Sequence, residues 1–332
     1  MPELPEVEVV RRGLLPHVIG RRIERVEILD ARTARRQAGG PHALVADLTG
    51  ARVDALVRRG KFLWWRLSDP ERAEIAGGAD SAEGIGFGPQ VALMTHLGMS
   101  GQLRVRSDGG SGASIVPADA AVSEGPASDP RRHRRATLHL DDGTQIDFLD
   151  QRLFGGLWTS ALAPTADGHP AGEGSPDALL PVDAAHIARD LLDPAANLPA
   201  IARRLRTRTA SIASLLLAQG LVSGIGNIYA AEGLWAARAH PDTPGAMLSQ
   251  VRAHRILRET AAVMRRALDV GGTSFDALYV NVDGRSGYFA RSLAAYGREG
   301  EPCPRCGRGI VRFQRQGRSC FVCPGCQRLS RG

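Results

Sequence analysis

The chain opens on an octet, Met1-Pro2-Glu3-Leu4-Pro5-Glu6-Val7-Glu8, that combines a helix start with a reactive terminus. Residues 4–19 carry apolar side chains on one side and arginines on the other, the spacing of an amphipathic helix. Removal of Met1 would leave Pro2 as a secondary amine; α-amino groups titrate at about pH 8, so this amine is partly nucleophilic at neutral pH. With a sugar aldehyde it gives a cationic iminium, and Glu3 beside it can transfer protons. Alone, a start at Met-Pro-Glu is common and carries no functional meaning.

Length and composition indicate a globular protein. The 332 residues suffice for two domains, and a hydrophobic content of 43% is ordinary. No apolar run approaches the roughly 18 residues of a membrane span, and the N-terminus lacks a signal-peptide pattern. We expect a cytoplasmic protein with no membrane partner.

The formal net charge of +7 is unevenly distributed along the chain. Residues 1–200 carry 22 basic and 27 acidic side chains, whereas residues 201–332 carry 20 basic and 8 acidic ones. A basic C-terminal part in a chain with a pI near 9.7 is typical of a polyanion binder. The alternative is a proteome that is generally rich in arginine.

Lysine is almost absent from the chain. Of the 42 basic residues only Lys61 is a lysine, which suggests a coding bias toward arginine. Arginine does not replace lysine where a compact ammonium is needed, so we expect a function for Lys61, although chance survival is the alternative. If the protein forms a Schiff base, only Lys61 and the N-terminus can provide the amine.

The first half of the chain has the pattern of an antiparallel β-sandwich. Short segments rich in β-branched and aromatic residues alternate with Gly or Asp turns. We expect strands over 22–29, 51–57, 61–67, 91–97, 101–105, 136–140 and 144–149. Three stretches rich in small, polar or acidic residues, 68–90, 107–132 and 163–181, resemble solvated insertions without chemistry.

The apolar period becomes helical from about residue 183. We expect helices over 185–192, 198–206, 211–218, 228–239 and 248–270. The change of period predicts a domain boundary near residues 160–185.

Four cysteines near the end of the chain have the spacing of a metal site. Cys303 and Cys306 are separated from Cys323 and Cys326 by sixteen residues, the pattern of paired zinc knuckles on a β-hairpin. Four thiolates favour one closed, structural Zn²⁺ site over disulfides in a reducing compartment. Cys320 also forms a Cys-x-x-Cys spacing with Cys323, but we exclude it because the other four flank their own turns.

Three further motifs lie at expected turns. Residues 221–230, Leu-Val-Ser-Gly-Ile-Gly-Asn-Ile-Tyr-Ala, place two glycines and Asn227 before a helix, whose free N–H groups can bind phosphate. Residues 96–101 (His-Leu-Gly-Met-Ser-Gly) and 150–155 (Asp-Gln-Arg-Leu-Phe-Gly) follow strands. From the residues alone, Met99 and Phe154 fit core packing equally well, and His96 fits a structural histidine.

Together these motifs closely resemble the bacterial formamidopyrimidine-DNA glycosylases, which excise oxidised purines. The octet, His-Leu-Gly-Met-Ser-Gly, Asp-x-Arg-x-Phe, Gly-Ile-Gly-Asn-Ile-Tyr-Ala and the cysteines carry the resemblance. It implies a multi-domain α+β fold. The expected parts are a catalytic β-sandwich with an N-terminal helix over 2–160, a linker over 161–182, a helix-two-turn-helix domain over 183–298 and a zinc-finger hairpin over 299–328.

The resemblance also assigns roles to single residues. It implies a catalytic group of four residues, Pro2, Glu3, Lys61 and Arg318. Within this group Lys61 would pair with a phosphate next to the lesion, and Arg318 would be the finger arginine that reaches the lesion and the DNA backbone. The resemblance implies that three side chains fill the gap left by the everted base, those of Met99, Arg152 and Phe154. It also implies contacts with the DNA backbone for His96, Asn227 and Tyr288. The Gly-rich residues 271–289 resemble a loop that closes over the excised purine.

The implied function is base-excision repair. The enzyme would act as a DNA-formamidopyrimidine glycosylase and as a lyase at apurinic or apyrimidinic sites, working as a monomer on damaged duplex DNA without a nucleotide cofactor. The alternatives are an endonuclease VIII-like enzyme for oxidised pyrimidines and a non-catalytic zinc-finger DNA-binding homologue. The chain departs from the family pattern at Ala213 and Ala218, where lysine and aspartate are usual, which bears on lesion preference.

Overall fold

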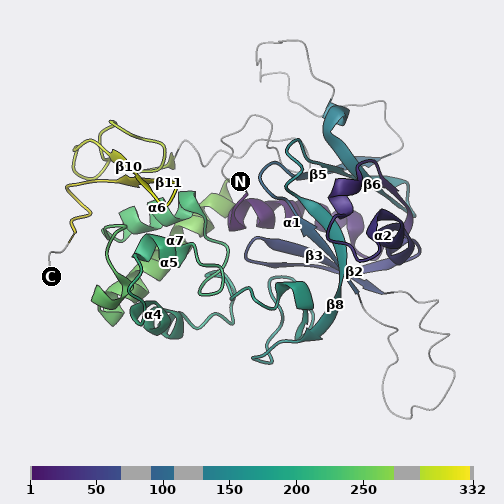
Figure 1. Ribbon diagram of the computed structural model, residues 1–332, viewed down its shortest axis with the longest axis horizontal. Coiled ribbons are helices and arrows are strands. Elements are labelled where there is room, and N and C mark those ends of the chain that lie inside the picture. The colour runs from purple at the N-terminus through teal and green to yellow at the C-terminus, as the bar shows by residue number, and fades with distance from the viewer. Residues whose placement is uncertain (1, 69–90, 108–129, 273–291, 330–332) are drawn as a thin grey trace.

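A computed structural model describes residues 2–68, 91–107, 130–272 and 292–329 of the chain. Figure 1 shows two parts, a β-sandwich on one side and a group of helices with a β-hairpin on the other. Tyr288 and residues 273–289 of the Gly-rich stretch lie outside the described residues. Within the described part, no helix is long and apolar enough to cross a membrane.

Two antiparallel sheets form the sandwich, which confirms the predicted fold class. The four-stranded sheet has the order β1-β6-β7-β5, with the bounds Ile23–Ile28, Arg134–Leu140, Thr144–Leu149 and Gln102–Ser107. The five-stranded sheet has the order β2-β3-β4-β8-β9, with the bounds Arg52–Arg59, Phe62–Ser68, Val91–His96, Gly156–Pro164 and Leu179–Pro181.

The five-stranded sheet is buried on both faces. Successive side chains of a strand point to opposite faces, and on β3 Trp65 joins the core between the sheets whereas Trp64 joins a second cluster. Ala171 and Leu180 belong to that second cluster, and Glu173 pairs with β2 at Arg58. Residues 163–181 therefore differ from the solvated loop that their composition suggested, because they cover the outer face of the sheet and supply β9.

Most helices of the second part match their predicted positions. They are α4 (Leu198–Arg206), α5 (Ile212–Leu216), α6 (Asn227–Ala236) and α7 (Gln250–Asp269). The helix expected over 185–192 is wrong. A short 3₁₀ turn, Val182–Ala184, precedes irregular backbone in which the side chains of Asp190 and Asp193 accept backbone N–H groups two residues ahead. Such local bonds compete with helix formation.

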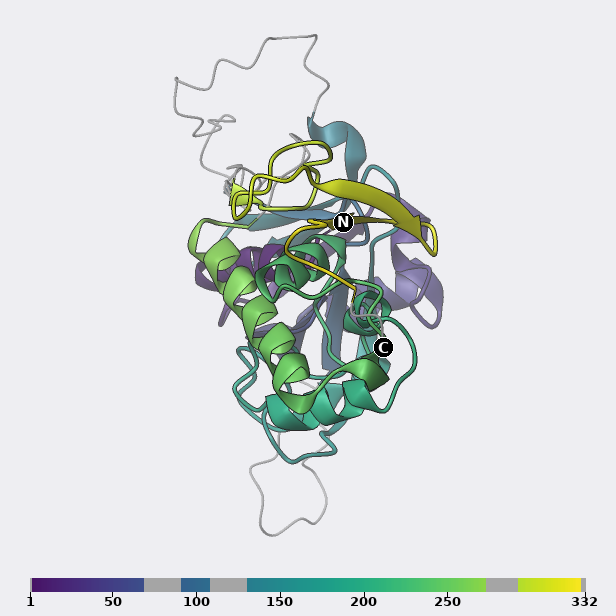
Figure 2. The same cartoon turned by 90° about the vertical axis from the view of Figure 1, so that its left-hand side faces the viewer.

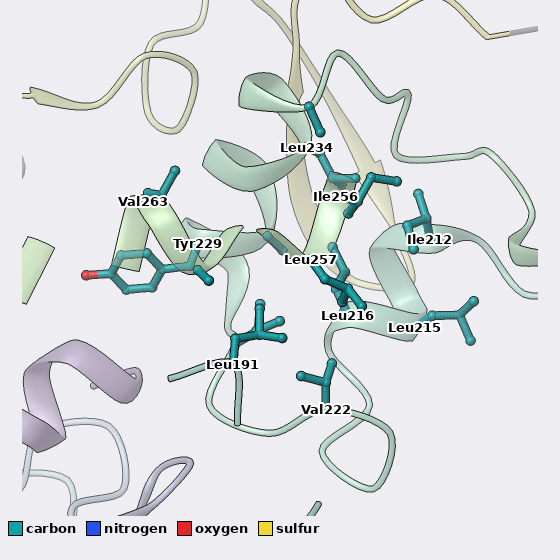
Figure 3. Close-up of a cluster of buried hydrophobic side chains, with 14 of the residues drawn as sticks. Leu191, Ile212, Leu215, Leu216, Val222, Tyr229, Leu234, Ile256, Leu257 and Val263 are labelled. Atoms are coloured by element: carbon teal, nitrogen blue, oxygen red, sulfur yellow. The ribbon is translucent and has the colours of Figure 1, made fainter. Parts of the chain in front are cut away.

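Helix α1 (Leu4–Val18) joins the two parts (Figure 1). Its first residue, Leu4, lies in the helical core, whereas Val7, Val10, Leu14 and Val18 lie in the core of the sandwich. Tyr229 belongs to the helical core, and Figure 3 shows its hydroxyl at the edge of that cluster. The sequence pattern does not predict helix α2 (Gly40–Leu48), in which only Leu44 and Leu48 are buried.

The C-terminal hairpin is formed by β10 (Val311–Arg315) and β11 (Arg318–Val322). Figure 2 shows this yellow hairpin above the green helices. It is anchored to the end of α6, where Arg305 stacks at 4.0 Å over the ring of Trp235 and Gln327 donates to the carbonyl of Ala239 at 2.9 Å. The hairpin is therefore held in place by packing as well as by its cysteines.

Candidate active site

The carboxylate of Glu3 binds the N-terminus of α6. It accepts the backbone N–H groups of Gly226 at 2.6 Å and Ile228 at 2.9 Å, and a longer one from Tyr229 at 3.4 Å. These groups have no partner inside the helix, and the helix dipole favours an anion there. Pro2 is buried directly before Glu3. The structure thus brings the terminal residues to the Gly-Ile-Gly-Asn turn.

Glu3 holds a proton far more readily than an ordinary carboxylic acid. Burial, which leaves the residue 3% exposed, raises its pKa to about 7, with a smaller contribution from Glu6. Lys61 and the N–H groups of α6 act in the opposite direction. Near neutral pH both protonation states are therefore populated, which is what a proton-transferring group requires.

Both glycines of the turn are needed for this approach. A Cβ on Gly226 would lie 2.4 Å from Oε1 of Glu3. At Gly224 the backbone is left-handed, with φ of +87°, and a Cβ would lie 2.6 Å from Leu4. These contacts explain the two glycines by a close approach of α1, in addition to any approach of phosphate.

Glu6 supports the same contact from the first turn of α1. Its carboxylate accepts the backbone N–H of Glu3 at 2.9 Å and the hydroxyl of Tyr229 at 2.8 Å. Tyr229 is a residue that sequence reasoning missed as part of the site. Apart from its place in the motif, the sequence contains no signal that Tyr229 belongs to the site. An aromatic residue on the apolar face of a helix is usually explained by core packing.

Lys61 reaches the same turn from the hairpin between β2 and β3. Its Nζ donates to the carbonyl of Ile225 at 2.9 Å. Burial lowers the pKa of Lys61, the carboxylates of Glu3 and Glu6 raise it, and the nearby charge of Arg318 lowers it further. The single lysine is therefore at the site, with Glu3 on one side and the finger arginine within electrostatic range.

A buried ion cluster holds the hairpin that carries Lys61. Arg58, 1% exposed, donates to Glu8 at 2.9 Å and to Asp190 at 2.7 Å, and Asp190 also accepts the N–H of Gly60 at 2.9 Å. Burial opposes ionisation of Glu8, but the guanidinium groups of Arg11 and Arg58 outweigh it and lower the pKa of Glu8 to about 2. The cluster ties α1 and β2 to the segment before α4.

Asn227 and Arg318 line one small pocket of about 30 Å³ between α6 and the hairpin. Ala213, one of the two departures from the family pattern, lies in the wall of this pocket, as does Cys320. The N-terminus of α6, the hairpin and Ala213, the position at which the family usually has a lysine, therefore all line the same pocket.

The two sandwich loops lie against each other. The hydroxyl of Ser100 donates to Asp150 at 2.6 Å, and a Cβ on Gly98 would lie 2.5 Å from the nitrogen of Gly155. Met99 and Phe154 are 40% and 50% exposed, and the guanidinium of Arg152 lies 5.1 Å from the ring of Phe154. Their exposure argues against core packing for Met99 and Phe154.

His96 is the last residue of β4, directly before the first of these loops, and lies within electrostatic range of Lys61. Burial, followed by the charges of Arg36 and Arg35, lowers its pKa to about 4, so the imidazole is neutral at physiological pH. Nδ1 accepts the N–H of Gly98 at 3.2 Å, which places the ring proton on Nε2. His96 can therefore offer one neutral N–H donor.

Four thiols form a cluster that fits a metal ion. The Sγ atoms of Cys303, Cys306, Cys323 and Cys326 all lie within 4.8 Å of one another. Zn–S bonds of about 2.3 Å in a tetrahedron require S–S separations of about 3.8 Å, and two of the pairs lie at 4.0 and 3.4 Å. The donor set is that of a closed structural zinc site, and Cys320 is not part of it.

Comparisons with known proteins agree with this geometry. The formamidopyrimidine-DNA glycosylase N-terminal domain family matches residues 1–157, and the formamidopyrimidine-DNA glycosylase H2TH domain family matches residues 187–278. The formamidopyrimidine-DNA glycosylases of Corynebacterium efficiens and Leifsonia xyli are each 46% identical to the chain, over 99% of its length and 100% of theirs.

Solved structures give the same result. The MutM (Fpg) protein of Thermus thermophilus superposes with a TM-score of 0.71 at 32% identity, covering 98% of both chains. Lactococcus lactis Fpg in complex with abasic-site DNA gives 0.71 at 26% identity, covering 98% of this chain and 100% of its own. The chain belongs to the formamidopyrimidine-DNA glycosylase family.

Proposed function

We propose that the protein is a base-excision repair enzyme that removes oxidised purines from duplex DNA and then cleaves the strand. The observation that carries this proposal is the carboxyl group of Glu3, buried next to Pro2 with a pKa of about 7. A nucleophilic amine and a proton donor side by side are the two groups that glycosylase chemistry at C1′ requires.

The proposed reaction begins at the sugar. Once Met1 is removed, the nitrogen of Pro2 attacks C1′ while Glu3 donates its proton to the ring oxygen. The bond from C1′ to the base breaks, and the base leaves with the bonding electron pair and takes up the proton that the attacking nitrogen releases. The nitrogen lone pair then breaks the bond from C1′ to the ring oxygen, so the sugar opens to an iminium with a free 4′-hydroxyl. The iminium acidifies the C2′ proton, so the 3′ phosphate and then the 5′ phosphate leave by β,δ-elimination.

Other side chains of the site would bind the DNA. We assign Lys61, His96, Asn227 and Arg318 to phosphates around the lesion. Lys61 lies in electrostatic range of Glu3, of His96 and of Arg318, and Asn227 shares a pocket with Arg318, which supports this assignment. The basic C-terminal part supplies affinity that falls with salt. We also propose that Tyr288 lies near the DNA backbone, and this assignment rests on the sequence resemblance alone.

Met99, Arg152 and Phe154 would fill the gap left by the everted base. Eversion costs a few kcal/mol of unstacking, which an inserted apolar side chain and a guanidinium facing the orphaned base partly offset. The exposure of Met99 and Phe154 on adjoining loops supports this assignment.

Borohydride reduction tests the proposal. The protein is incubated with a duplex containing 8-oxoguanine, reduced, digested and mapped by mass spectrometry. We expect the crosslink on the amine of Pro2, in protein that lacks Met1. A crosslink on Lys61, or none in protein that excises the base, would contradict the assignment. A parallel duplex with thymine glycol tests the endonuclease VIII-like alternative, which faster excision of the pyrimidine would favour.

A further inference from the structure

The loop from Asp150 to Gly155 presents the exposed side chains of Arg152 and Phe154. Phe154 is 50% exposed, and its one described ring contact is the guanidinium of Arg152, itself exposed. A side chain that is exposed to this extent is positioned largely by the backbone beneath it. We define Arg152 and Phe154 as the wedge, and its precision depends on the loop backbone.

That backbone is held in an uncommon conformation. Leu153, between the two wedge residues, has a φ of 56°, in the left-handed region that disfavours residues with a Cβ. Such a residue persists only where its surroundings fix it, at a cost of about 1–2 kcal/mol. Some feature of the structure must therefore stabilise the loop.

One arginine binds three consecutive carbonyl groups of the loop. Arg35, which follows the 3₁₀ helix Ala31–Ala34, donates from Nη1 to Leu153 at 3.0 Å and to Gly155 at 2.8 Å, and from Nη2 to Phe154 at 2.9 Å. A planar guanidinium can span these acceptors, whereas the compact ammonium of lysine cannot.

The N–H groups of the loop are held separately. The carboxylate of Asp150, 1% exposed, accepts the N–H of Arg152 at 3.1 Å and that of Gly155 at 2.7 Å. Arg35 and Asp150 thus bind the two kinds of backbone group, the carbonyls and the amides. The hydroxyl of Ser100 also accepts the N–H of Arg152, at 3.1 Å. The carbonyl groups are bound by Arg35, which lies more than a hundred residues away in the chain.

We propose that Arg35 is a positioning residue that fixes the wedge in its inserting conformation before DNA binds. The inference rests on the proposed function, because the wedge acts only when a base is everted. A preorganised loop avoids an ordering cost in the step that replaces the base.

The test measures single-turnover excision of 8-oxoguanine from a duplex by Arg35→Lys and Arg35→Gln. We expect both to be slowed about tenfold, equivalent to about 1.4 kcal/mol. Arg36→Gln is the matched control, because Arg36 also lowers the pKa of His96 but stacks on Trp158 instead of binding the loop. We expect it to stay within about twofold of the parent. Full activity in Arg35→Lys would show that only the charge matters and would overturn the proposal.

A double-mutant cycle tests whether Arg35 acts through the wedge. In a background that carries both Arg152→Ala and Phe154→Ala, Arg35→Lys should cause little further loss, because both side chains of the wedge are already absent. An undiminished tenfold loss in that background would indicate a general structural role and contradict the proposal.

Amide hydrogen exchange of the DNA-free protein provides a readout that needs no activity. Arg35→Lys should accelerate exchange in the peptide containing residues 150–155, and Arg36→Gln should not. Unchanged exchange would overturn the proposal. If the parent protein excises neither 8-oxoguanine nor thymine glycol, the proposed function is wrong. The exchange experiment still decides in that case whether Arg35 holds the loop.

Discussion

The carboxylate of Glu3 accepts the backbone N–H of Gly226 at 2.6 Å, across 223 residues of sequence. This contact places the first described residues of the chain against the start of α6. It joins the sandwich to the helical part at the point where the chemistry is proposed to occur. The electrostatic properties of the site therefore depend on the packing of α1 against the Gly-Ile-Gly-Asn turn.

Gly226→Ala should separate Glu3 from the helix N-terminus. The new methyl group would lie 2.4 Å from Oε1 of Glu3, so the carboxylate must move. We expect base excision to fall at least tenfold (about 1.4 kcal/mol or more), with damaged-DNA binding largely kept. Gly220→Ala is the control, since its Cβ would find its nearest neighbour at 3.7 Å. Equal losses in both variants would contradict a specific role for Gly226.

Lys61→Met should shift the pH dependence of base excision. Glu3 must be protonated to act as an acid, so excision falls as the pH rises above about 7. Because Lys61 lowers the pKa of Glu3, loss of its charge should move this alkaline limb to higher pH while reducing the rate. Lys61→Arg, which keeps a charge, should leave the limb near its original position. Single-turnover rates from pH 5 to 9 provide the measurement, and a limb that does not move would exclude this coupling.

Pro2→Gly should abolish most excision and strand cleavage. Glycine supplies a primary amine whose imine must be protonated to become a comparable electron sink. Binding of damaged DNA, measured by anisotropy at fixed salt, should be largely retained because the phosphate-binding residues are unchanged. Full activity in this variant, or in protein that still carries Met1, is the result that this mechanism does not allow.

Cys326→Ser should release zinc and weaken DNA binding. Removing one of four thiolates opens the site, and structural zinc contributes folding energy directly. Cys320→Ser is the matched control, because Cys320 lies on β11 outside the cluster and should keep one zinc per chain. Zinc is measured with a chromogenic chelator. DNA affinity that is undiminished in metal-free Cys326→Ser would show that the hairpin folds without its metal.

Arg58→Met should destabilise the protein by about 3–5 kcal/mol, since it leaves the buried carboxylates of Glu8 and Asp190 without their shared partner. Denaturant unfolding at pH 7 provides the measurement. Because the folded-state pKa of Glu8 is depressed from 4.5 to about 2, its stabilisation is present above about pH 4.5 and is lost as the pH falls through about 2. The deficit of the variant should shrink over that acid range. A deficit below about 1 kcal/mol at pH 7 would mean that the cluster relaxes.

Features that are local in the chain could be predicted from the sequence. The cysteine spacing predicted four thiols that the structure brings within 4.8 Å, and strand alternation predicted both sheets of the sandwich except β8 and β9. The presence of a single lysine in the chain also predicted a function for Lys61. Each of these signals is contained in a short segment whose side chains meet through local backbone geometry.

The action of distant segments on one another became visible only in the folded chain. Burial raises the pKa of Glu3, and N–H groups more than two hundred residues away lower it. The three carbonyls bound by Arg35 lie more than a hundred residues away in the chain. The sequence of an exposed arginine after a 3₁₀ turn carries no sign of its acceptors. Burial and long-range hydrogen bonds arise from packing between elements, and packing is set by the whole fold rather than by any one stretch of sequence.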